Sequence, residues 1–239
     1  MRGAAGGNRE RDSVSVEYRV ISIGALSGHP LWGEGPGLRT AHATTTLIRA
    51  GSRVIVVDPG LPAAALAARL NERSGLRAEQ VTDVFLTNFR PAHRGGLAAF
   101  GKAAVWVSEA ERESVGRELV AAYEEETDEE TREVLRGEIA LLRATKGAPD
   151  RLAEGVDLFP LPGFTPGGCG LILPLAGSTV VVAGDAVGTG EHLAAGRVLD
   201  RPFDAGAARE SFREVIEIAD VIVPGHDNLL VNPMRGGRF

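Results

Sequence analysis

The segment Thr87–Gly96 reads TNFRPAHRGG and directly follows Val84–Leu86 (VFL), a short apolar run. The apolar run predicts a buried strand, and the polar residues, proline and paired glycines after it predict a loop. Loops at strand ends often carry binding and catalytic residues, because the rigid sheet holds them in place. The segment is therefore predicted to form part of a functional site at the edge of a sheet.

Polar or turn residues also follow apolar runs at three other places, and a fifth loop joins two predicted strands. These four segments are Asp58–Gly60 (DPG), Pro162–Gly170 (PGFTPGGCG), Gly184-Asp185 and Pro224–His226 (PGH). Each motif is short and weak by itself. Together they predict a site built from several loops.

Runs rich in β-branched residues alternate with helix-like segments along the whole chain. The expected strands are 16–23, 44–48, 53–57, 84–86, 105–107, 156–161, 171–175, 179–183 and 220–223. Helices are expected after residues 60 and 108, from residue 127, where Thr127 and Glu130 match a capping box, and over 208–219. Strands clustered in two halves with helices between them indicate two sheets sandwiched by helices.

In their order, the five loop segments resemble the motifs of the metallo-β-lactamase superfamily. Those motifs are Asp-x-Gly, Thr-His-x-His-x-Asp-His-x-Gly-Gly, Pro-Gly-His-Thr-Pro-Gly-His, Gly-Asp and a late Pro-Gly-His. The resemblance runs from about Val16 to His226. It implies an α/β fold, a four-layer αβ/βα sandwich of two mixed β-sheets flanked by helices. It also implies one domain over residues 14–239, after a tail of residues 1–13 that we expect to be disordered.

The resemblance is poorer at the ligands of the family's first metal. The two early histidines of that metal correspond to Asn88 and Arg90, and its third histidine corresponds to Phe164. A second metal ion should therefore have no site. Arg90 is expected to point into the lost metal position and to pair with Asp185, because a guanidinium can stand in for a missing cation.

The family's second metal keeps more of its ligands. Its own aspartate corresponds to Ala92 and is lost, whereas His93, Asp185 and His226 remain. Two imidazoles and a carboxylate are enough for a catalytic zinc ion, and they also suit non-haem iron. The resemblance thus implies at most one zinc or iron ion, or none. Asp58 is expected to support a ligand from behind or to form its turn.

The remaining histidines and the single cysteine are expected to have lesser roles. His29 lies with Trp32 in a Gly/Pro-rich loop that would overhang the site, and Trp32 would cover an apolar ligand there. His29, His42 and His192 are candidate replacement ligands, although each is more simply a loop histidine. Cys169 is expected to be a small buried apolar residue, because no base is identified beside it.

Three functions remain open on these residues. The first is a hydrolase that uses one metal to activate water against a small ester, thioester or lactone. The second is a non-catalytic pseudo-enzyme or regulatory protein in which Arg90 binds an anion. The third is an iron-dependent oxygen enzyme like the persulfide dioxygenases, whose fuller ligand set argues against it. In each case the expected partner is a small molecule, in some cases anionic.

Composition and charge exclude several other classes. The chain has 239 residues, a net charge of −6 and 44% hydrophobic residues. An acidic chain repels phosphate backbones, which argues against a nucleic-acid partner. No apolar run reaches the length of a membrane span, and one cysteine excludes an intramolecular disulfide, which fits the cytoplasm. The acidic stretch 124–130 (EEETDEE) is interpreted as a solvated helix junction, and the oligomeric state is left open.

Overall fold

Two mixed β-sheets of six strands each face one another in the computed structural model, which describes residues 15–235. The first sheet has the order β1-β2-β3-β4-β5-β6 and the second the order β12-β11-β10-β9-β8-β7. The first contains β1 (Val16–Ser22), β2 (Thr45–Ala50), β3 (Arg53–Val57), β4 (Asp83–Leu86), β5 (Ala104–Val107) and β6 (Lys146–Gly147). The second contains β7 (Arg151–Ala153), β8 (Val156–Pro160), β9 (Cys169–Leu175), β10 (Ser178–Gly184), β11 (Val221–Pro224) and β12 (Leu230–Val231).

Each sheet combines antiparallel and parallel pairs. In the first sheet β1, β2 and β3 run antiparallel, and β3 to β6 are parallel neighbours. In the second, β7 to β10 are antiparallel and β10 pairs in parallel with β11. The helices are α1 (Ala63–Ser74), α2 (Pro91–Arg94), α3 (Glu109–Glu125), α4 (Glu129–Ala144), α5 (Gly190–Ala195) and α6 (Ala205–Ile218), with 3-10 turns at Pro30–Trp32, Ala78–Gln80 and Leu97–Phe100.

Strand β3 shows how the alternating pattern of the sequence divides the core. Ile55 and Val57 pack between the two sheets with Phe85 and Leu171, whereas Val56 belongs to the cluster beneath α1. Successive strand residues point to opposite faces, so a wholly apolar strand must be covered on both sides. The run RVIVV therefore specifies an inner strand of a layered fold.

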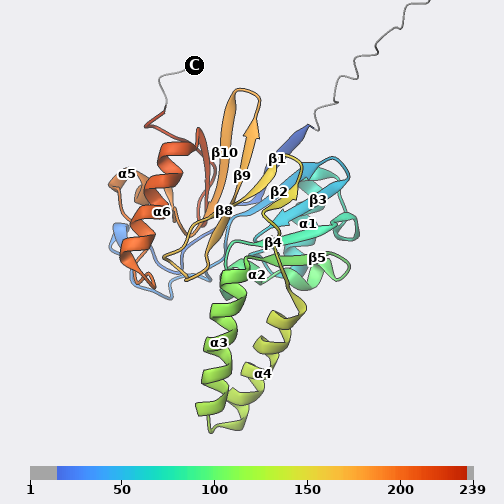
Figure 1. Cartoon of the computed structure of the whole chain (residues 1–239), viewed down its shortest axis with the longest axis vertical. Coiled ribbons are helices and arrows are strands. Elements are labelled where there is room, and N and C mark those ends of the chain that lie inside the picture. Colours follow the sequence, from blue (N-terminus) through green and yellow to red (C-terminus); the bar gives the residue numbers. More distant parts are fainter. Residues whose placement is uncertain (1–14, 236–239) are drawn as a thin grey trace, which may run out of the picture.

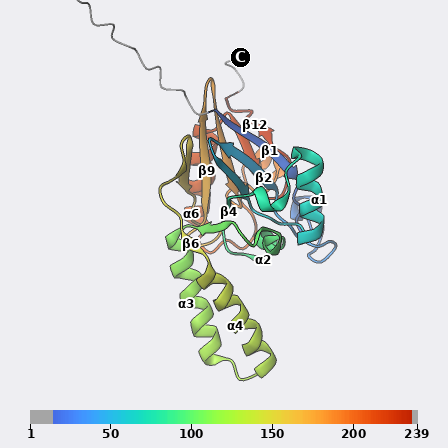
Figure 2. The ribbon, with the colours of Figure 1, turned by 90° about the vertical axis from the view of Figure 1, so that its right-hand side faces the viewer.

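The outer faces of the two sheets are covered by different helices. Leu66 and Leu70 of α1 are buried against the first sheet, and Phe212 and Val215 of α6 pack against the second. Figures 1 and 2 show α1 and α6 on opposite sides of the paired sheets. Helix, sheet, sheet and helix thus form the predicted four-layer sandwich.

Helices α3 and α4 form a hairpin that extends away from the sheets (Figures 1 and 2). Helix α3 begins as expected, with the Ser108 hydroxyl accepting a hydrogen bond from the Glu111 amide. The capping box expected at Thr127 is wrong by one residue, because Asp128 caps α4 and accepts from the Thr131 amide and hydroxyl. The negative carboxylate suits the positive end of the helix better than a hydroxyl does.

The expected strands and the last helix are found within a few residues of their predicted bounds. Short elements such as β6, β12 and α2 were not predicted, since they carry too few residues for a periodic pattern. The predicted tail of residues 1–13 lies outside the described residues. Among residues 15–235, no helix is long and apolar enough to cross a membrane.

Candidate metal centre

The five motif loops meet at one edge of the sandwich, and backbone hydrogen bonds tie them together. The Cys169 amide donates to the Thr87 carbonyl, and the Thr44 amide donates to the Gly225 carbonyl. Strand β10 ends at Gly184, which packs against Thr87. Gly184 has a φ of +52°, and a Cβ at this position would lie 2.5 Å from the Thr87 Oγ1. Only glycine fits this close approach, which sets the position of the next residue, Asp185.

His93, Asp185 and His226 come together as predicted, although more than 40 residues separate His226 from Asp185 and more than 90 separate Asp185 from His93. The His93 Nε2 lies 3.0 Å from Asp185 Oδ2, and the His226 Nε2 lies 3.0 Å from Asp185 Oδ1. All three side chains are buried, and one nitrogen or oxygen from each lies within 4.8 Å of the others. Among residues 15–235, no other group of three His, Cys, Asp or Glu side chains offers such a cluster.

The opposite nitrogen of each imidazole is held by an oxygen acceptor. The His93 Nδ1 lies 3.0 Å from Asp58 Oδ2, and Asp58 also accepts hydrogen bonds from the amide and hydroxyl of Thr87. The His226 Nδ1 lies 3.0 Å from the carbonyl of His42, which can only accept. Both Nδ1 atoms therefore carry the proton, and both Nε2 atoms face Asp185. Asp58 takes the supporting position expected for it, with a left-handed φ of +48°.

This arrangement requires a cation beside Asp185. Two Nε2 lone pairs would otherwise face ionised carboxylate oxygens at 3.0 Å, an acceptor-to-acceptor contact. Burial alone would lower the pKa of His93, but the carboxylates of Asp185 and Asp58 raise it to about 10. Burial alone would raise the pKa of Asp185, but His93 and His226 hold it well below its usual range. A proton or a metal ion can fill the requirement, and the donor set of two imidazoles and one carboxylate fits zinc or iron.

Asn88 contacts the same carboxylate. Its Nδ2 donates to Asp185 Oδ2 at 2.9 Å and lies 3.3 Å from the His93 Nε2. Its Oδ1 accepts from the Arg90 amide at 3.0 Å, which fixes the orientation of the side-chain amide. The residue at a lost ligand position thus supplies a hydrogen-bond donor to Asp185. Only the position of Asn88 in the motif could have indicated this role from the sequence.

The predicted ion pair between Arg90 and Asp185 is wrong. The Arg90 guanidinium lies over the Phe164 ring, 4.2 Å from its centroid, and the side chain is exposed. Asp185 is only 6% exposed and already has His93, His226 and Asn88 as partners. Burying a guanidinium there would cost its hydration without giving it a free oxygen, whereas stacking on Phe164 leaves its edge in water.

A cavity of about 420 Å³ opens onto the cluster. Arg90, Ala92 and Phe164, which occupy three lost ligand positions, line it beside His93, Asp185 and His226. The Gly/Pro-rich loop covers one side through Leu26, Pro30 and Pro36, as expected of an overhanging loop, and Leu199, Asp200 and Arg201 line another. The segment 199–201 was not predicted, because nothing in its sequence marks it.

The other candidate ligands lie away from the cluster. The His29 Nε2 lies 3.1 Å from the hydroxyl of Thr189, which also contacts the His192 Nδ1 at 2.9 Å. The Trp32 ring stacks on His29, with centroids 4.1 Å apart. Trp32 was expected to cover a ligand in the cavity, but it does not line that cavity. His42 contributes its carbonyl but not its imidazole. These contacts fasten the overhanging loop to α5 and bring no further imidazole to Asp185.

Cys169 is buried in the core between the sheets. Burial raises the pKa of its thiol to about 12, so the thiolate is not formed near neutral pH. This agrees with the interpretation of Cys169 as a small apolar residue.

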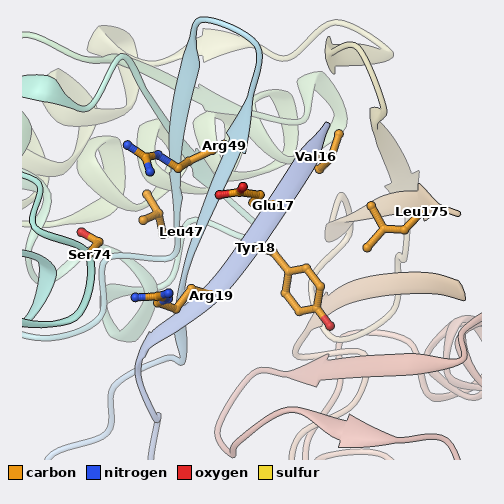
Figure 3. Close-up of a pocket in the computed structure, with 8 residues that line it drawn as sticks. All are labelled: Val16, Glu17, Tyr18, Arg19, Leu47, Arg49, Ser74 and Leu175. Carbon is orange, nitrogen blue, oxygen red and sulfur yellow. The ribbon is translucent and has the colours of Figure 1, made fainter. Parts of the chain in front are cut away.

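A second cavity, of about 460 Å³, lies at the free edge of β1 (Figure 3). It is lined by Tyr18, by Glu17, Arg19 and Arg49, and by Leu175 from the other sheet. Although it is slightly larger, it holds none of the motif residues and no cluster of ligating side chains. The site at the motif loops is therefore the better candidate for chemistry.

Comparison with known proteins agrees with this fold. Residues 39–226 match the sequence profile of the metallo-beta-lactamase superfamily, and the chain belongs to that superfamily. No curated protein matches the chain. A putative metallo-beta-lactamase from Thermotoga maritima superposes with a TM-score of 0.65 at 17% identity, over 90% of this chain and 99% of that one. A mutant of AiiA from B. thuringiensis, with N-decanoyl-L-homoserine bound at the active site, gives 0.60 at 21% identity, over 90% and 94%.

Proposed function

We propose that the chain is a hydrolase that uses one metal ion, held by His93, Asp185 and His226, to cleave a small ester, thioester or lactone. The observation that carries this proposal is the orientation of the two imidazoles, whose Nε2 atoms both face Asp185 at 3.0 Å. The comparisons support the substrate class, since one similar structure is described as an N-acyl homoserine lactone hydrolase with its product N-hexanoyl-L-homoserine bound at the catalytic metal centre. A divalent ion at this place would supply Lewis acidity, which polarises a carbonyl and acidifies water.

The protein's own groups would hold the reacting geometry. Asp58 and the His42 carbonyl keep both imidazoles in the tautomer that presents Nε2. Asn88 donates to Asp185 Oδ2 and so limits the rotation of that carboxylate. Ala92 leaves space in the cavity where the family has a carboxylate, and no other side chain of the described cluster replaces it as a proton acceptor.

The test is hydrolysis of an acyl lactone, an aryl ester and an acyl thioester by protein purified without a chelator. We expect turnover of at least one of them that a chelator abolishes and added zinc or iron restores. If none of the three is hydrolysed by protein that contains metal, the hydrolase assignment fails. Oxygen-dependent turnover by iron-loaded protein would favour the oxygenase alternative instead.

The non-catalytic alternative is favoured by one specific contact. Asn88 and a protonated His93 already satisfy Asp185 Oδ2 without a metal. A protein that folds fully and takes up no zinc or iron would be this pseudo-enzyme. The same preparation therefore separates the two functions before any substrate is tried.

The Asp58→Asn variant tests the support behind His93. An asparagine keeps the shape, but its amide nitrogen would oppose the Thr87 donors and weaken the orientation of the imidazole. We expect the zinc affinity to fall about 10- to 100-fold, the range for loss of a partner that orients a ligand. Zinc titration by calorimetry gives the dissociation constant.

The matched control is Asp83→Asn. Asp83 is also a buried carboxylate of the first sheet, but it pairs with Arg53 at 2.6 Å at the far end of β4. Its replacement should leave zinc affinity unchanged. Equal losses in the two variants would mean that Asp58 acts only through general stability.

A further inference from the structure

The cavity beside His93, Asp185 and His226 has an unbalanced set of charges. Its rim carries two acidic residues, and each is paired with an arginine outside the cavity lining, Glu34 with Arg39 and Asp200 with Arg197. The two arginines that do line the cavity, Arg90 and Arg201, form no ion pair with a carboxylate of residues 15–235. The charges left available to a ligand are therefore cationic.

The Arg90 side chain is held by a stacking contact, and the exposed Arg201 projects from a constrained backbone. Arg90 is stacked on Phe164 at 4.2 Å, which leaves the guanidinium edge with its N–H donors uncovered. Arg201 has a left-handed φ of +57°, a backbone conformation that L-residues rarely adopt. The segment after it is fixed to the Phe164 loop, because the Phe203 amide donates to the Phe164 carbonyl at 3.2 Å.

The rest of the lining is largely apolar. Leu26, Pro30 and Pro36 of the overhanging loop, with Leu199, form walls that suit a hydrocarbon chain or ring. A planar monoanion with an apolar body fits these surroundings, and a guanidinium fork matches a carboxylate.

We propose that Arg90 and Arg201 form a subsite that selects substrates carrying a carboxylate on an apolar body. This proposal rests on the proposed hydrolase function for its site, and it names the class of substrate that the site would take. The family's first metal ion has no site here, and arginine side chains of the same cavity would take its place. They would bind the carboxylate of the substrate and would not activate the reacting bond. Arg90 is then a specificity-determining residue, not a catalytic one.

The experiment is calorimetric titration of the chelator-treated protein with octanoate and with octanamide, which share one skeleton and differ in charge. We expect octanoate to bind at least about tenfold more tightly, and to weaken as salt screens the arginines. Arg90→Gln and Arg201→Gln should each reduce octanoate affinity about tenfold and leave octanamide binding unchanged. Arg213→Gln, an exposed arginine of α6 away from the cavity, is the control for net charge and should change neither.

Four outcomes would overturn the proposal. Three concern the two probes: equal affinity for them, no octanoate binding, and octanoate binding that survives both substitutions. The fourth is displacement of octanoate by an equal concentration of inorganic phosphate, which would show that the site prefers a phosphate. Because no metal or turnover is involved, a protein that hydrolyses lactones but shows no preference for octanoate would lose only this inference. A protein that prefers octanoate but takes up no metal would lose the hydrolase function and keep the two arginines as a carboxylate-binding site, whose ligand would then not be a substrate.

Discussion

Replacement of Asp185 by alanine should remove the metal ion from the protein. Asp185 is the one carboxylate of the cluster, and it lies 3.0 Å from both imidazole Nε2 atoms. Its loss removes a ligand and the negative charge that attracts the cation. Loss of a partner that only orients a ligand costs 10- to 100-fold in affinity, so we expect a loss of more than about 100-fold here. Chelator-sensitive hydrolysis should disappear with the metal.

The control for this variant is Asp200→Ala, which removes a carboxylate from the rim of the same cavity. It should keep one metal per chain. A second variant, Asp185→Asn, keeps the shape of the side chain, and it should also lose the metal if charge and ligation matter. Equal metal content in Asp185→Ala and the unaltered protein would remove Asp185 from the site.

Metal affinity should rise steeply with pH. The pKa of His93 is raised to about 10 in the metal-free protein, so the imidazole is protonated at neutral pH. A metal ion can bind the Nε2 only after that proton leaves. Each rise of one pH unit, up to about pH 10, should therefore weaken the competition from the proton and lower the apparent dissociation constant about tenfold. Between about pH 6 and pH 8 the expected gain is about 100-fold.

Calorimetry in buffers of different ionisation enthalpy measures this effect as proton release, and we expect at least one proton per metal ion bound. An apparent affinity that stays flat over the same range would contradict a protonated His93 between Asp58 and Asp185. At saturating zinc or iron, the fraction of protein with bound metal should not depend on pH over this range.

The stability of the metal-free protein should change in the opposite direction. The folded-state pKa of His93 lies above its ordinary value of 6.5, so the folded state binds the proton more tightly than the unfolded chain does. That stabilisation is fully present below about pH 6.5 and is lost as the pH rises through about 10. Thermal unfolding without metal should therefore occur at a lower temperature at about pH 9 than at about pH 7.

The architecture could be predicted from the sequence because its apolar residues recur at the spacings typical of strands and helices. Arg53–Val57 and Thr179–Ala183 lie where the pattern placed them, each buried on both faces between a sheet and a helix. Helix starts were less certain, because two neighbouring residues, Thr127 and Asp128, are both good caps and only packing and charge decide between them. The two-residue strands β6 and β12 and the four-residue helix α2 carry too little pattern to be predicted.

The site was predictable where motif position fixes the backbone and less so where side chains compete. His93, Asp185 and His226 meet because their strand ends meet, which the order of the motifs already implies. Arg90 and Asn88 come from the same loop, and sequence alone does not show which of them reaches Asp185. The shorter, neutral amide does so because its burial costs less than that of a guanidinium.

The most direct test of the one-metal site is the stoichiometry of bound metal. Protein purified without chelator is titrated with zinc and with ferrous iron, and the bound metal is measured by mass spectrometry. We expect one equivalent of metal per chain, because His93, Asp185 and His226 keep the ligands of the family's second metal whereas Asn88, Arg90 and Phe164 replace those of the first. The Asp185→Ala variant should bind none. Two equivalents per chain in this pocket, or none under any of these conditions, would contradict it.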